Sequence, residues 1–332
     1  MNIKHIVSDF TSLLRIIGAK ITGNYFPFSV TLIITCKCNY RCQYCDVFND
    51  DEKEMTTGEI ISVIDDLAEL GTRRLSLNGG EALLREDLGT VISHAKNRGM
   101  FVTLFTNGSL ISRNIENLKG LDVILISLDG PREIHDAQRI PGSFDQVMEG
   151  IESAKEAGLT VWTNTVITKH NLDSLDFILD TARKLKIHTC WQPVFNYIHS
   201  PGGQRIEALL FDEQKYGTVI NRLISEKKAG GPIVHSIDYL RYIRNPDWNQ
   251  NNRTCWAGKF YFAITPSGRA APCYPIYREE NWPNCIELGC EEAFKRIGDF
   301  SCGGCYCLTV ENDFIFDLRL KNMVNSWKKI RT

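Results

Sequence analysis

Three closely spaced cysteines are the residues of this chain best suited to chemistry. Cys38, Cys42 and Cys45 follow the pattern C-x3-C-x2-C. Thiolates are soft ligands that suit zinc and iron–sulfur clusters. A closed structural zinc site usually has four protein ligands, whereas this loop offers three. A 4Fe–4S cluster held here would keep one iron open to a ligand that is not protein, and we favour it over a zinc site.

A second group of cysteines lies toward the end of the chain. Cys255 and Cys273 stand near the two ends of a predicted β-hairpin whose turn is Pro266-Ser267-Gly268. Cys302-Gly303-Gly304-Cys305 is a C-x2-C pair, and its glycines let the backbone wrap closely around a metal site. These four cysteines are a second candidate ligand set, for an iron–sulfur cluster or alternatively for zinc. The cysteines left over in this region are Cys285, Cys290 and Cys307.

Alternating strands and helices are predicted to position the first cysteine loop. Apolar runs predict strands at 30–35, 74–77, 100–106, 122–128, 159–168 and 187–193. Helical spacing lies between them, at about 56–70, 87–98, 111–119, 143–157 and 172–185. Thr56 with Glu59, and Ser143 with Gln146, are predicted to cap two of these helices. Six such units with parallel pairing indicate an open, partial (β/α)6 barrel in an α/β protein.

Polar motifs stand at the carboxyl ends of the first four predicted strands. The cysteine loop follows the first strand, and the three after it end in 78–81 (Asn-Gly-Gly-Glu), 106–108 (Thr-Asn-Gly) and 127–130 (Ser-Leu-Asp-Gly). Barrel enzymes place their sites on this face, so we expect the four motifs to meet at one mouth.

The cysteine spacing, followed by Gly79-Gly80-Glu81, resembles the radical S-adenosylmethionine (SAM) superfamily. That resemblance implies a 4Fe–4S cluster on Cys38, Cys42 and Cys45, with SAM bound to the open iron. It also implies reductive cleavage of SAM and abstraction of a hydrogen atom from an organic substrate.

The same resemblance implies which residues hold SAM. Tyr44 should lie against the adenine, and Gly79, Gly80 and Glu81 should meet the amino group, as a carboxylate and exposed backbone suit an ammonium. Ser127 and Arg139 match residues that hold the SAM carboxylate or ribose, and Thr106 is a weaker candidate. The glycine-containing motif of the fifth strand is absent, and 164–167 (Asn-Thr-Val-Ile) stands in its place.

The C-terminal pattern Cys255-x12-Gly268-x4-Cys273 is similar to the entry of a SPASM or twitch domain. With Cys302 and Cys305 it implies one auxiliary 4Fe–4S cluster, and the leftover cysteines keep a second one open. Position 311 is Glu where the full SPASM order has a cysteine. We therefore divide the chain into an amphipathic helix (1–28), a radical SAM partial barrel (29–205), a bridge (206–252) and a SPASM/twitch-like domain (253–332).

The substrate is left open by the sequence. Members with this layout modify ribosomal peptides or tailor small molecules, by oxidation, epimerisation or crosslinking. Cys190, in the sixth strand, is a candidate hydrogen donor if it faces the barrel, although free cysteines are commonly buried for packing. The resemblance also implies a flavodoxin or ferredoxin as electron donor. The alternatives are a lipid-directed enzyme, suggested by the amphipathic residues 3–20, and a non-catalytic iron–sulfur or zinc-binding protein.

Composition excludes several other classes. The 332 residues carry a net charge of −2, which gives no sign of a nucleic-acid partner. The first 28 residues include Asp9, Arg15 and Lys20, so they are neither a signal peptide nor a membrane span. Twelve cysteines in such a chain predict a reducing, cytoplasmic setting in which they serve as ligands rather than disulfides.

Overall fold

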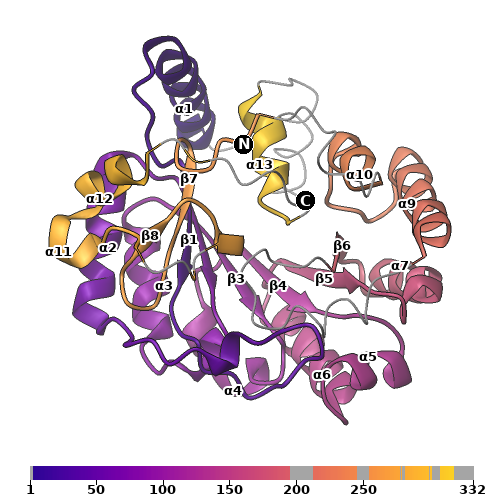
Figure 1. Cartoon of the computed structure of the whole chain (residues 1–332). Helices are drawn as coiled ribbons and strands as arrows, with labels where there is room; N and C mark the ends of the chain where they lie inside the picture. The colour runs from indigo at the N-terminus through magenta and orange to yellow at the C-terminus, as the bar shows by residue number, and fades with distance from the viewer. Residues whose placement is uncertain are drawn as a thin grey trace.

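The computed structural model describes residues 3–194, 212–244, 254–276, 278, 281–298, 300 and 307–317, with side chains described except at 3–10 and 315. Cys302, Cys305 and the helix predicted to run to Trp327 lie outside the described residues. In Figure 1 the strands form one curved sheet, and helices cover its outer side.

Six parallel strands form the body of the sheet, close to the predicted positions. They are β1 (Ser29–Ile33), β2 (Arg74–Asn78), β3 (Phe101–Thr106), β4 (Val123–Ser127), β5 (Val161–Ile167) and β6 (His188–Pro193). Their order is β6-β5-β4-β3-β2-β1, and each neighbouring pair is parallel. Parallel neighbours need crossover connections, which the intervening helices supply. The predicted partial (β/α)6 architecture is confirmed.

The helices pack on the outer face of the sheet. They are α2 (Thr57–Leu70), α3 (Leu88–Asn97), α4 (Ile111–Asn114), α5 (Arg132–Gln138), α6 (Ser143–Glu156) and α7 (Leu175–Leu185), with single 3-10 turns at η1 (Val47–Asn49), η2 (Ala82–Leu84), η3 (Ile115–Leu118) and η4 (Leu172–Ser174). Alternate strand residues such as Leu75, Leu77 and Val102 are fully buried in one cluster with helix residues such as Ile64. Each such side chain contributes about 1.5–3 kcal/mol on burial.

The inner face of the same strands is more open. Thr31 of β1, Ser76 of β2 and Thr103 of β3 lie side by side in register, and all three are half-buried. Successive strand residues point to opposite faces, which explains the alternation along β2 and β3 between buried and half-buried positions. The inner face therefore carries accessible polar side chains, as a binding surface does.

A hairpin from the C-terminal part of the chain extends this sheet. β7 (Tyr261–Ile264) pairs in parallel with β1, and β8 (Ala270–Ala271) pairs antiparallel with β7. The predicted hairpin is confirmed, and Gly268 in its turn has φ of +88°, a conformation that favours glycine. β1 consequently lies inside an eight-stranded sheet, between β2 and β7.

The remaining helices flank the ends of the sheet. They are α9 (Glu213–Lys228), α10 (Ile237–Arg244), α11 (Cys285–Leu288), α12 (Cys290–Ile297) and α13 (Val310–Phe316), with a 3-10 turn at η6 (Tyr274–Ile276). The helix predicted near 212–228 is confirmed as α9, and the Asp212 side chain caps it by accepting from the Lys215 amide.

The N-terminal helix predicted over 3–20 is α1 (Ile3–Thr22), which stands out from the sheet in Figure 1. Ile16 and Ala19 are buried against the hairpin region in a cluster with Phe26 and Phe260. Leu14 and Ile21 remain 52% and 79% exposed. Among the described residues, the structure contains no helix with the length and apolar character needed to cross a membrane.

The capping box at the start of α2 is confirmed. The Thr56 hydroxyl accepts from the Glu59 amide at 3.3 Å, and the Glu59 carboxylate accepts from the Thr56 amide at 2.7 Å. We expect Thr56→Ala to lower the free energy of unfolding by about 1 kcal/mol, because one helix N–H loses its partner. Urea denaturation checks this, with Thr218→Ala, an exposed mid-helix threonine of α9, as the control. Equal losses in the two variants would contradict the capping role.

The predicted capping box at the start of α6 was wrong. Gly142 is the N-cap, and the Ser143 hydroxyl donates to the Asp136 carboxylate at 3.0 Å. That same carboxylate accepts from the Gly142 and Phe144 amides, so it does the capping. Gln146 instead accepts a hydrogen bond from the Tyr40 hydroxyl at 2.7 Å. A carboxylate seven residues before Ser143 thus replaces the predicted capping box.

Candidate functional site

The cysteine loop follows β1 at the carboxyl end of the sheet. Cys42 is buried, and Cys38 and Cys45 are half-buried. The Cys45 amide donates to the Cys42 carbonyl at 3.2 Å, and the Tyr40 amide donates to the Cys38 sulfur at 3.4 Å. Cys36, two residues before the set, is buried.

The three thiols lie close enough to influence one another. Burial raises the pKa of each of them, to about 11 for Cys42, and a second cysteine of the set raises it further in every case. No three His, Cys, Asp or Glu side chains in the described part of the chain are arranged to hold a single metal ion. A 4Fe–4S cluster spreads its thiolates over separate irons, so three neighbouring cysteines with an accessible side fit it better than they fit zinc.

The Gly-Gly turn after β2 packs directly on the backbone that leads into the cysteine loop. A Cβ at Gly80 would lie 2.3 Å from the Lys37 carbonyl oxygen and 2.6 Å from that of Cys36. At Gly79, where φ is +154°, a Cβ would lie 2.3 Å from the Thr35 oxygen. The Gly80 amide donates to that Thr35 carbonyl at 2.8 Å. Glycine is therefore required here by close backbone approach.

Glu81 is fully buried and links the ends of two strands. Its carboxylate accepts from the Thr106 hydroxyl and the Asn107 amide, both at 2.8 Å, and from the Leu83 amide at 3.1 Å. Burial raises the pKa of this carboxyl, and these donors act in the opposite direction. Glu81 and Thr106 therefore bond to each other in this structure and set the shape of the loops around the cysteines.

Asp129 is the site residue for which the sequence analysis assigned no role. Its buried carboxylate accepts from the Tyr44 hydroxyl at 2.6 Å, the Arg139 Nε at 2.8 Å and the Val166 amide at 3.0 Å. It thereby joins the cysteine loop, the end of α5 and β5 to the end of β4. Its place in the motif 127–130, at the carboxyl end of a strand, was the available signal.

Ser127 and Cys190 face the same side of the sheet. Ser127 of β4 pairs in register with Asn164 of β5, which pairs with Cys190 of β6. Ser127 is half-buried, whereas Cys190 is 3% exposed and packs in a cluster with Val123 and Leu125 rather than in the main cluster that contains the helices. This placement brings Ser127 to the mouth and Cys190 to the inner face.

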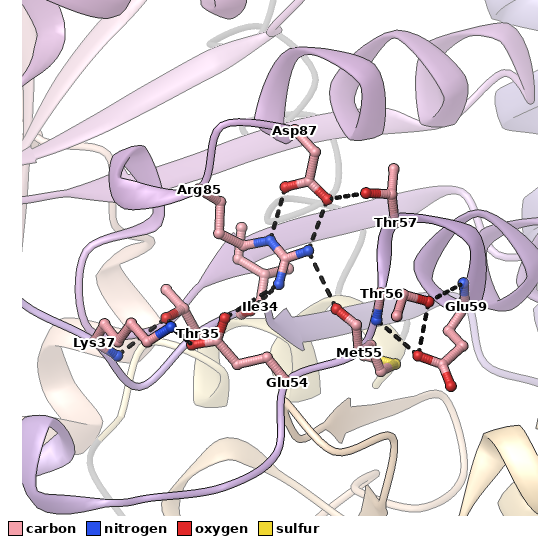
Figure 2. Close-up of polar contacts among 10 residues, drawn as sticks. All are labelled: Ile34, Thr35, Lys37, Glu54, Met55, Thr56, Thr57, Glu59, Arg85 and Asp87. Carbon is pink, nitrogen blue, oxygen red and sulfur yellow. Dashed lines mark hydrogen bonds and ion pairs between the residues drawn. The ribbon is translucent and has the colours of Figure 1, made fainter.

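The segment after the cysteines is fastened by Arg85 (Figure 2). Its guanidinium donates to the Asp87 carboxylate at 2.7 and 2.9 Å, to the Met55 carbonyl at 3.2 Å and to the Ile34 carbonyl at 3.1 Å. Glu54 accepts from the Thr35 hydroxyl at 2.5 Å in the same network. Both ends of the cysteine loop are thus tied to the turn after β2.

The C-terminal hairpin also holds this segment. Arg278 forms ion pairs with Asp46 and Asp50, both at 2.8 Å, and Arg269 pairs with Glu52. Because Asp46 directly follows Cys45, these ion pairs connect the first cysteine loop to the C-terminal part of the chain that contains the second group of cysteines.

The C-terminal cysteines divide into two places. Cys255 and Cys273 belong to the cluster of α1 and the hairpin, and the Cys255 sulfur lies 3.6 Å from the Tyr261 hydroxyl. Cys285, Cys290 and Cys307 belong to the main core, where the Cys290 sulfur lies 3.8 Å from the Val63 carbonyl oxygen. Cys255 and Cys273 therefore share one apolar cluster, and their role as metal ligands stays a prediction.

His135 makes the stability of the folded protein depend on pH. Its Nδ1 accepts from the Asp129 amide at 3.1 Å, and burial, aided by Arg139, lowers its pKa to about 4 from 6.5. As pH falls, this histidine is therefore protonated in the unfolded chain before it is protonated in the folded one. The free energy of unfolding is consequently highest above pH 6.5 and decreases as pH falls toward 4. The pKa difference corresponds to ~3 kcal/mol.

We expect His135→Gln, which cannot titrate, to lose less unfolding free energy than the wild type between pH 7 and 4. Denaturant titrations at several pH values measure this difference. Parallel pH profiles for the two proteins would contradict it.

Comparisons with known proteins agree with this geometry. The profile of the family described as "Radical SAM superfamily" matches residues 32–182. An Fe-coproporphyrin III synthase of Methanosarcina barkeri is 35% identical over 161 residues, 46% of this chain and 40% of that protein. An AdoMet-dependent heme synthase of Oleidesulfovibrio alaskensis is 28% identical over 264 residues (72% and 68%). A PqqA peptide cyclase of Granulibacter bethesdensis is 28% identical over 261 residues (75% and 68%). The aligned regions thus span about two fifths to two thirds of these relatives.

Solved structures show the same fold. Streptococcus suis SuiB bound to S-adenosylmethionine superposes with a TM-score of 0.67 at 15% identity, over 81% of this chain and 66% of that one. The His-tagged anSMEcpe with bound AdoMet gives 0.65 at 18% identity, over 81% and 80%.

Proposed function

Residues 32–182 belong to the radical SAM superfamily, and on that premise we propose that this protein reductively cleaves SAM and abstracts a hydrogen atom from an organic substrate. The observation that carries the proposal is the meeting of three thiols with the Gly-Gly turn, Glu81 and Arg139 at the carboxyl end of one parallel sheet. A metal-binding protein without catalysis would need the thiols alone.

In this proposal Cys38, Cys42 and Cys45 hold a 4Fe–4S cluster. The cluster, once reduced, supplies an electron that breaks a carbon–sulfur bond of bound SAM and so generates a hydrogen-abstracting radical. The chain's own residues orient the ligand and exclude water. Gly79 and Gly80 would offer their backbone groups to the ligand. The Glu81 carboxylate holds that turn by accepting a hydrogen bond from the Asn107 amide.

Further SAM contacts are proposed from the positions of the remaining residues. Ser127 is half-buried at the end of β4, and Thr106, at the end of β3, donates a hydrogen bond to Glu81. Arg139 offers its Nη2 to the SAM carboxylate, because its hydrogen bonds to the described residues use Nε and Nη1. Tyr44 packs with Val166 and Val194, where an adenine ring would find an apolar neighbour.

Cys255 and Cys273, together with Cys302 and Cys305, are proposed to hold one auxiliary 4Fe–4S cluster. The burial of Cys285, Cys290 and Cys307 in the main core supports one such cluster rather than two. A flavodoxin or ferredoxin is the proposed electron donor.

Peptides are the substrate class we put first. SuiB has been solved bound to the precursor peptide SuiA and anSMEcpe with bound Cp18Cys peptide, and one relative is a peptide cyclase. A small-molecule reaction is the second candidate, because other relatives are named for the synthesis of Fe-coproporphyrin and heme. Cys190 on the inner face is the proposed hydrogen donor, an assignment that unchanged turnover and product stereochemistry in Cys190→Ala would remove.

The deciding experiment is anaerobic reconstitution of the chain with iron and sulfide, followed by SAM and a strong reductant. We expect about eight irons per chain for two clusters, and about twelve if a third is present. 5′-Deoxyadenosine and methionine should appear only when reductant is added. If the protein bound zinc in place of iron, or bound iron but formed no 5′-deoxyadenosine, the catalytic proposal would be wrong. The protein would then be the non-catalytic metal-binding alternative.

A further inference from the structure

Arg139 is held on the cysteine side of the site. It follows the end of α5, where its amide donates to the His135 carbonyl at 3.0 Å, and it is 7% exposed. Its Nε donates to the Asp129 carboxylate at 2.8 Å, and its Nη1 donates to the sulfur of Cys42 at 3.8 Å. One guanidinium therefore joins a buried carboxylate to a cluster ligand.

The charges of this arrangement are unusual for a protein interior. Burial alone would lower the pKa of Arg139, but Asp129, Tyr44 and Cys42 together raise it well above its ordinary value. A buried cation is tolerated only beside a partner of opposite charge, which Asp129 supplies. The sulfur of Cys42 thus receives a charged hydrogen bond.

We propose that Arg139 and Asp129 form a buried pair that sets the reduction potential of the cluster through the sulfur of Cys42. The inference rests on the proposed function, since it needs the cluster on Cys38, Cys42 and Cys45. Hydrogen bonds to ligand sulfurs and local charge are among the factors that set cluster potentials. A cation at the sulfur stabilises the more negative, reduced state and raises the potential, and Asp129 moderates that effect.

The pair makes two predictions of opposite sign. Arg139→Gln removes the positive charge, so the cluster becomes harder to reduce and its midpoint potential falls. Asp129→Asn leaves the cation uncompensated, so the midpoint potential rises. Arg139→Lys keeps the charge and should stay closer to the wild type than Arg139→Gln does. A purely structural role gives no reason for opposite shifts.

The experiment is a redox titration of the reconstituted full chain followed by electron paramagnetic resonance, without SAM. The signal of this cluster is the one missing from the Cys38/Cys42/Cys45→Ala variant. Arg132→Gln is the matched control, because Arg132 begins α5, the helix that Arg139 follows, but forms an exposed ion pair with Asp145. Its potential should equal that of the wild type.

The result that overturns the inference is an unchanged potential in both variants, or shifts of the same sign. Weaker SAM binding by Arg139→Gln at an unchanged potential would likewise overturn it and leave Arg139 as a SAM ligand alone. If Arg139→Gln, Asp129→Asn and Arg139→Lys all fail to load iron, the pair serves folding and the inference is also lost. A wild type without this cluster contradicts the proposed function itself, which separates the two failures.

Discussion

Replacing Cys38, Cys42 and Cys45 together by alanine should remove about four irons per chain and abolish the formation of 5′-deoxyadenosine. The loss is complete because the proposed 4Fe–4S cluster needs these three thiolates as its ligands, whereas the proposed auxiliary cluster has ligands of its own. Iron and sulfide analysis, with product detection after addition of SAM and reductant, measures both effects.

Cys36→Ala is the matched control for this variant. Cys36 is 3% exposed, lies two residues before the set and has a thiol pKa raised to about 12, mainly by burial. It should retain the full iron content and the product. A similar loss of iron from Cys36→Ala, or 5′-deoxyadenosine from the triple variant, would contradict the assignment of the ligands.

The second large effect is expected from Gly80→Ala. The added methyl group would overlap the carbonyl oxygens of Lys37 and Cys36, and both are backbone atoms that cannot rotate away. Overpacking of this kind costs about 1–3 kcal/mol, and here the strain falls on the segment that leads into Cys38. We expect a lower free energy of unfolding and weaker SAM binding, measured by denaturation and by equilibrium dialysis with labelled SAM.

Gly217→Ala provides the comparison. Gly217 lies inside α9 with open space around its Cα, so alanine should stabilise the helix by about 0.5–1 kcal/mol and leave SAM binding unchanged. If both glycine variants behaved alike, the close approach of Gly80 to the cysteine segment would not matter for the site.

The regular elements were predictable because their signals are local. The apolar alternation of β2 and β3 and the capping box of Thr56 with Glu59 each depend on residues within one turn or strand. The cap of α6 was not predicted, because the Asp136 carboxylate, seven residues before Ser143, accepts a hydrogen bond from the Ser143 hydroxyl. Local patterns hold until a nearby side chain offers a better partner.

The connections of the site were harder to foresee. Asp129 bonds to Tyr44 across 85 positions of sequence and to Val166 across 37, and no spacing rule links such residues. The cysteines and the Gly-Gly-Glu motif were found because their chemistry requires those residue types. The parallel pairing of β7 with β1 joins segments from opposite ends of the chain, and only the fold reveals it.

That late pairing has a consequence for synthesis on the ribosome. β1 to β6 are all made before β7, so until β7 is made β1 is an unpaired edge strand of the nascent sheet, beside the cysteine loop. Exposed strand edges invite pairing with other chains. Until Arg278 reaches Asp46 and Asp50, that loop also lacks the contacts that close it from the hairpin side. The order of translation therefore leaves the cysteine loop open for a period in which the proposed cluster could be delivered, and leaves an exposed strand edge that chaperones would protect.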